Sequence, residues 1–128
     1  MSDIVNNYFR RFYPAQIDLS KFYPRSGIGG SIMREYTDKS VSNIFPSIVC
    51  ADGLTMSVQG HYGAYSHPRD DFAEHYYAVE ILGPAVEEFA KFKSDTVDNE
   101  TLYAYVPVRI VVAVIEKHGG LAAGGEQS

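Results

Sequence analysis

The chain has 128 residues, of which 45% are hydrophobic and 21% are charged, a composition typical of one globular domain rather than of a disordered chain. Its formal net charge of −5 argues against a nucleic-acid partner bound through phosphates. The single cysteine, Cys50, excludes an internal disulfide, and no apolar stretch approaches the roughly 20 residues that a membrane-spanning helix needs. We therefore expect a cytoplasmic domain with no membrane partner.

The first 13 residues have the spacing of a short amphipathic helix. Ser2 or Asp3 can cap its N-terminus, and Pro14 ends the pattern. Its apolar residues recur every three or four positions, as expected for one helix face: Ile4, Val5, Tyr8, Phe9 and Phe12.

Beyond this helix, prolines and glycines interrupt the chain and predict an irregular arm that extends to residue 43. The arm contains two copies of one aromatic motif, Phe12-Tyr13-Pro14 and Phe22-Tyr23-Pro24. These rings are candidate anchors that hold the arm on its own domain, bind a partner, or insert into a second copy of the chain.

Two apolar segments joined by Asp52-Gly53 predict a β-hairpin. Residues 44–50 are rich in β-branched side chains, and residues 54–59 alternate strictly between apolar and polar side chains. This alternation predicts a core-facing set, Leu54, Met56 and Val58, and a set that faces water or a partner, Thr55, Ser57 and Gln59.

The chain then gives the order strand, proline, helix. We expect a strand over residues 74–82 and a helix opened by Gly83-Pro84. The inward face of that helix is predicted to contain Val86, Phe89, Ala90 and Lys93. Residues 94–100 are polar and acidic, which indicates a connection without regular structure.

The same order follows a second time. A strand over residues 102–106 precedes Pro107, and the next helix is amphipathic and ends at Gly119-Gly120. Residues 121–128 are mostly small and predict a flexible tail.

These elements together predict one α+β domain, a mostly antiparallel sheet with a β-hairpin and with helices packed on one face. The expected divisions are an N-terminal helix and arm over 1–43, an α+β core over 44–120, and the tail over 121–128.

The loop between residues 61 and 75 contains side chains used in metal binding and in acid–base chemistry: His61, His67, Asp70 and Asp71. Their spacing matches no compact zinc pattern, and the chain has no HExxH motif or cysteine pair. We therefore predict no metal and no cofactor. A small metal- or nucleotide-binding enzyme that uses this loop is kept as the alternative function.

Aromatic residues also concentrate in this loop and in the strand that follows it. Tyrosine and arginine are the residues that interaction hot spots use most. The candidate partner-binding residues are Tyr62, Tyr65, Arg69, Phe72 and Tyr76, with Phe22 and Tyr23 from the arm. The alternative is that the loop rings cover an open end of the core.

Five short motifs between residues 47 and 120 are similar to small bacteriophage and prophage accessory proteins. They are Gly53-Leu54 leading to Ser57-Val58-Gln59, Ser66-His67-Pro68-Arg69, Tyr77-Ala78-Val79-Glu80, Tyr103-Ala104-Tyr105-Val106-Pro107 and His118-Gly119-Gly120. That family has no assigned activity, so the resemblance implies no site residues. It implies a protein that works in a bacterial cytoplasm and binds a host or defence complex.

The chain has no recognisable set of nucleophile, base and oxyanion donor, which favours a function other than catalysis. Our first hypothesis is a non-enzymatic accessory protein that binds and modulates a bacterial protein complex, for example as an anti-CRISPR inhibitor. A homo-oligomer that exchanges its N-terminal arms is a further alternative, with anchors Phe12, Tyr13, Phe22 and Tyr23.

Overall fold

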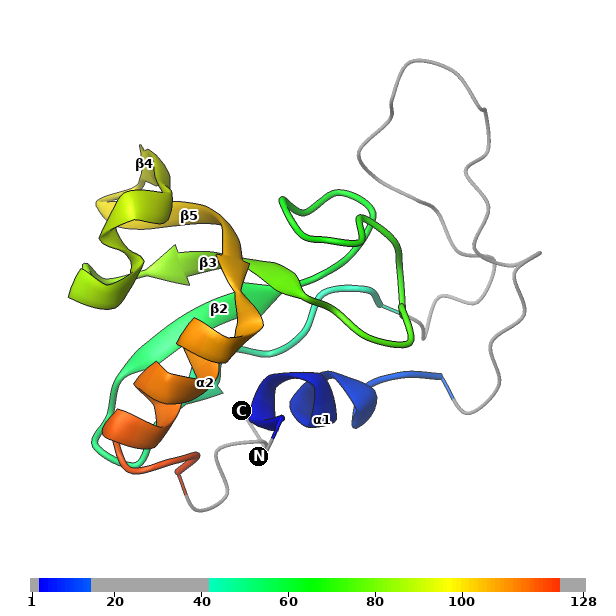
Figure 1. Ribbon diagram of the computed structural model, residues 1–128, viewed down its shortest axis with the longest axis horizontal. Helices are drawn as coiled ribbons and strands as arrows, with labels where there is room; N and C mark the ends of the chain where they lie inside the picture. Colours follow the sequence, from blue (N-terminus) through cyan, green and yellow to red (C-terminus); the bar gives the residue numbers. More distant parts are fainter. Residues whose placement is uncertain (1–2, 15–41, 123–128) are drawn as a thin grey trace.

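The computed structural model describes residues 3–14 and 42–122 and has an α+β fold (Figure 1). Five strands form one antiparallel sheet in the order β1-β2-β3-β5-β4. The strands are β1 Ile48–Val49, β2 Thr55–Gln59, β3 Ala78–Gly83, β4 Lys93–Val97 and β5 Glu100–Pro107. The helices are α1 Ile4–Arg10, α2 Val108–Lys117 and the 3₁₀ helix η2 Glu87–Phe92. Because α1 and α2 cover the same face of the sheet, the predicted fold class is confirmed.

The predicted hairpin is formed by β1 and β2, with Ile48 opposite Met56. Its turn contains Gly53 at φ 100°, a conformation that glycine adopts without a steric penalty. The prediction that Gln59 faces outward is wrong, because its side chain is buried. The Gln59 amide accepts the Phe45 N–H at 2.9 Å and donates to the Phe45 carbonyl at 2.7 Å. It thereby satisfies the backbone polar groups of a residue that precedes β1.

The second strand–proline–helix unit is confirmed. Helix α2 begins directly after Pro107, and its apolar face is buried. Gly119 and Gly120 both have positive φ, 92° and 84°, and the Gly120 N–H donates to the carbonyl of Ile115, which closes the C-terminus of the helix.

The first unit differs from the prediction, because the helix after Gly83-Pro84 is a 3₁₀ helix. Val86 and Phe89 are buried as expected, but Ala90 and Lys93 are exposed. A 3₁₀ helix has three residues per turn, so a stripe drawn with 3.6-residue spacing does not stay on its inner face. Lys93 moreover begins the next strand.

The polar connection expected over residues 94–100 is a strand and a tight turn. Strand β4 pairs with β5 through a two-residue turn, Asp98 at φ 51° and Asn99 at φ 69°. Two positive φ values match a type I′ hairpin. All five residues of β4 are exposed, and this absence of apolar alternation explains why the sequence pattern did not predict a strand.

Helix α1 shares its core with the sheet and with α2. Of the two predicted candidates, Asp3 is the N-cap, and its carboxylate accepts the Asn6 N–H at 3.0 Å. Phe9 stacks on Phe45 with ring centroids 4.3 Å apart. The buried Asn6 amide accepts the Tyr76 N–H at 2.8 Å and donates to the Tyr76 carbonyl at 3.0 Å, so it joins α1 to the segment that leads into β3.

The start of the expected tail is paired with the sheet. Leu121 forms a bridge with Cys50, and the Ala122 N–H donates to the Val49 carbonyl at 2.9 Å. Within the described ranges, no helix is both long enough and apolar enough to cross a membrane.

Candidate functional site

A β-bulge in β5 sets the conformation of Tyr105. Val79 pairs with Val106 and Ile81 pairs with Tyr103, so two residues of β5, one of them Tyr105, lie opposite Glu80. Tyr105 has φ 55°, which is rare for a residue with a bulky side chain and costs about 1–3 kcal/mol when the surrounding structure imposes it. The bulge turns Tyr105 away from the core that contains Tyr103.

The Tyr105 backbone joins β5 to the loop between β2 and β3. Its N–H donates to the Tyr65 carbonyl at 3.0 Å, and the two rings lie 5.9 Å apart at an interplanar angle of 38°. The Arg69 guanidinium carbon lies 5.6 Å from the centre of the Tyr65 ring, within cation–π range. Tyr65 and Tyr105 are 40% and 46% exposed. We call Tyr65, Arg69, Tyr105 and Glu80 the aromatic patch.

Glu80 forms the half-buried acidic part of the aromatic patch. It lies on the sheet face opposite the helices, since its strand neighbours Val79 and Ile81 point into the core. Its Oε2 accepts the Tyr65 N–H at 3.3 Å. Burial raises the pKa of Glu80, and the hydrogen bond from Tyr65 and the charge of Arg69 oppose that rise. The patch therefore combines two exposed rings, a cation and a partly desolvated carboxylate.

Two predicted partner-binding residues are interior instead. Tyr76 is 0% exposed and Phe72 is 6% exposed, so neither ring presents a surface. The Tyr76 hydroxyl donates to the Asp70 carbonyl and accepts the Ala73 N–H, which fixes the loop from within. Burial raises the pKa of Tyr76. These two residues match the alternative prediction, in which the rings of the loop cover an open end of the core.

A third candidate, Tyr62, is half-buried. Its N–H donates to Asp71 Oδ1 at 2.8 Å, and the same oxygen accepts the Asn43 amide at 3.1 Å. Asp71 is thus part of the hydrogen bonding that shapes the loop.

The structure does not gather the four metal candidates into one site. His61 is buried, its Nδ1 accepts the Gly63 N–H at 3.0 Å, and burial lowers its pKa. His67 is exposed and its ring lies 6.0 Å from that of Tyr77. Across residues 3–14 and 42–122, no group of three or more His, Cys, Asp or Glu is placed to hold a metal ion.

The first pair of arm anchors packs on the same chain. Phe12 lies 5.1 Å from Tyr8, and Tyr13 lies 5.3 Å from Phe72, between ring centroids. The Tyr13 hydroxyl donates to the Ala73 carbonyl at 2.5 Å, and burial raises its pKa to about 12. The second pair, Phe22 and Tyr23, lies outside the described residues.

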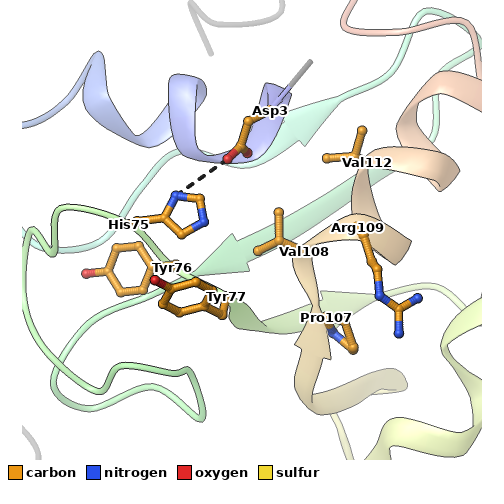
Figure 2. A pocket seen from close by; sticks show the side chains of 8 residues that line it. All are labelled: Asp3, His75, Tyr76, Tyr77, Pro107, Val108, Arg109 and Val112. Carbon is orange, nitrogen blue, oxygen red and sulfur yellow. Dashed lines mark ion pairs between the residues drawn. The ribbon is translucent and has the colours of Figure 1, made fainter. Parts of the chain in front are cut away.

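A separate cleft of about 380 Å³ opens between the start of α1, the start of α2 and the segment before β3 (Figure 2). None of its residues except Tyr76 was a predicted site residue. Its walls are formed by Asp3, His75, Tyr76, Tyr77, Pro107, Val108, Arg109 and Val112. No local motif marks it, because the three segments that form it are far apart in the sequence.

The bulge explains why sequence reasoning also missed Tyr105 and Glu80. Strict alternation along β5 would place Tyr103 and Tyr105 on the same face. The extra residue of the bulge separates them, and nothing in the motif Tyr-Ala-Tyr signals it.

No family model, curated protein or solved structure matches the chain.

Proposed function

We propose that this chain is a non-enzymatic binding protein that contacts a protein partner through the aromatic patch. The observation that supports this most is Tyr105, a bulky residue at φ 55° whose ring stays half-exposed beside Tyr65. Costly backbone conformations persist where the surrounding structure imposes them, and they concentrate at functional sites. Burial of the Tyr105 ring does not impose this conformation, because the ring is half-exposed; the β-bulge and the hydrogen bond to the Tyr65 carbonyl hold it.

The composition of the patch suits protein recognition. Tyrosine offers a large rigid contact area with few rotatable bonds, so little entropy is lost on binding. Arginine is enriched at interface hot spots together with tyrosine. The backbone bond from Tyr105 to Tyr65 and the position of Arg69 on the Tyr65 ring hold the patch in one arrangement before a partner arrives.

The proposed partner is a bacterial protein complex, and the basis for this is the resemblance of residues 47–120 to phage and prophage accessory proteins. Proteins of that class and size commonly act by disabling host machinery. An inhibitor of a defence system such as CRISPR–Cas is the most specific form of the proposal.

A quantitative pull-down from bacterial lysate tests the proposal. The bait is the full chain, compared with the double variant Tyr65→Ser/Tyr105→Gly and with the control Tyr77→Ser. Among the tyrosines of residues 3–14 and 42–122, Tyr77 is the most exposed, at 63%, and it lies outside the patch. We expect a stoichiometric partner that the double variant loses and the control retains. Equal recovery with all three baits would refute the assignment of the patch.

A further inference from the structure

We infer that the cleft in Figure 2 is a binding site for a small carboxylate with an aromatic or branched aliphatic body. Its volume of about 380 Å³ falls within the about 300–1,000 Å³ typical of small-ligand sites. The inference concerns a different surface from the aromatic patch and does not depend on the proposed function.

The residues that line the cleft indicate the apolar part of the ligand. Val108 and Val112 come from the first turns of α2, and Pro107 precedes them. Facing them is Tyr77, whose ring packs edge-on against His75 at a centroid distance of 4.7 Å (Figure 2). Aliphatic groups on one side and an aromatic ring on the other suit a flat or branched apolar group.

The charge of the ligand follows from which charged side chain in the cleft already has hydrogen-bonding partners. The Asp3 carboxylate accepts the Asn6 N–H at 3.0 Å and the Asn6 side-chain amide at 2.9 Å, and it lies 3.7 Å from His75 Nδ1. Arg109 is exposed and makes no ion pair or side-chain hydrogen bond within the described part of the chain. The charged side chain in the cleft that has unused hydrogen-bonding capacity is therefore Arg109, and its N–H donors favour an anion.

The position of Arg109 further restricts the anion. In Figure 2 the Arg109 side chain lies on the other side of Val108 from the Asp3–His75 pair. The first amide of α2 is already used, since the Val108 N–H donates to the Tyr77 carbonyl at 2.9 Å. The charged side chain available to an anion is the planar guanidinium of Arg109, which matches the two oxygens of a carboxylate. The apolar part then extends from Arg109 across Val108.

A titration of the full chain followed by ¹H–¹⁵N NMR tests the inference with three ligands of similar size. Phenylacetate carries the aromatic body and the carboxylate, phenylacetamide removes the charge, and phenethylammonium reverses it. We expect phenylacetate to shift the amides of Tyr77, Val108 and Arg109. Its Kd should be about tenfold lower than that of phenylacetamide, the factor expected for one charge-assisted hydrogen bond.

Two substitutions test whether the preference for a negatively charged ligand depends on Arg109. Arg109→Gln should weaken phenylacetate about tenfold and leave phenylacetamide unchanged. Lys91→Gln, which removes an exposed positive charge on η2 outside the cleft, should leave both unchanged. The inference is overturned if phenylacetate gives no shifts up to about 10 mM, if phenethylammonium binds as tightly, or if Arg109→Gln has no effect.

Discussion

Replacing Tyr105 by glycine and by alanine should reverse the order of stability that these two residues have in an ordinary strand. In a strand interior, glycine is less stable than alanine by roughly 0.5–1 kcal/mol, because it loses more backbone freedom on folding. Tyr105 has φ 55°, where a side chain with a Cβ atom is disfavoured by about 1–2 kcal/mol. Glycine does not have that penalty, whereas alanine keeps it.

The expected difference at position 105 is therefore about 0–1.5 kcal/mol in favour of glycine, with a central value of about 0.8 kcal/mol. Both substitutions remove the same ring contact with Tyr65, so the comparison isolates the backbone. Thr101 is the matched position in the same strand, paired with Gly83 on one side and Thr96 on the other. There we expect alanine to be more stable than glycine.

Urea unfolding of the four single variants, Tyr105→Gly, Tyr105→Ala, Thr101→Gly and Thr101→Ala, measures these differences as shifts in midpoint at constant m-value. If alanine is also the more stable residue at position 105, the backbone there is not strained. The main support for the proposed function would then be lost.

Three further substitutions have defined outcomes, all measured by urea unfolding. Burial raises the pKa of Glu80 in the folded chain, so ionisation of Glu80 lowers the free energy of unfolding as pH rises. The variant Glu80→Gln should therefore be as stable as the wild type in acid and more stable near neutral pH. A constant difference in stability from about pH 3 to 7 would contradict this. Gln59→Leu removes the hydrogen bonds to the Phe45 N–H and carbonyl and should lower the free energy of unfolding by about 2 kcal/mol or more. A change below about 0.5 kcal/mol would show that water replaces the Gln59 amide. Hydrogen bonds, first among them that from the Leu54 N–H, lower the pKa of Asp52, so its contribution is present above its unfolded pKa and lost as pH falls through the folded value. Asp52→Asn should thus destabilise the chain at neutral pH and lose its difference from the wild type in acid; a difference that persists in acid would exclude this ionisation as the cause.

The parts of the fold that the sequence predicted correctly are those with strong local signals. Asp52-Gly53 between two apolar segments marks the hairpin, and Pro107 with Gly119-Gly120 marks the limits of α2. These signals depend only on the conformational preferences of neighbouring residues. They are therefore visible without knowledge of what packs against them.

Strand β4 was missed because it lies at the sheet edge with every side chain exposed. An edge strand without a buried face has no reason to alternate apolar and polar residues, and charged residues there protect against unwanted pairing. The remaining signal is the turn Asp98-Asn99, whose two residue types tolerate positive φ. Together with the apolar segment that follows, this turn could have predicted the hairpin of β4 and β5.

The aromatic patch and the buried amides depend on relations between distant residues. Asn6 pairs with the backbone of Tyr76, 70 positions away, and Gln59 with that of Phe45, 14 positions away. The exposure of Tyr105 depends on the register of β3 against β5. Tyr65 and Arg69 could be predicted as partner-binding candidates from residue type, but their arrangement around Tyr105 could not.

Site-specific photo-crosslinking in bacterial cells tests the role of the aromatic patch most directly. The photoreactive amino acid benzoylphenylalanine is placed at position 65 or 105, both half-exposed in the patch, and at position 91 as an exposed control on η2. The proposed function predicts one discrete adduct of the same protein from positions 65 and 105, and none from position 91. Adducts from position 91 alone, or no adduct from either patch position, would contradict it.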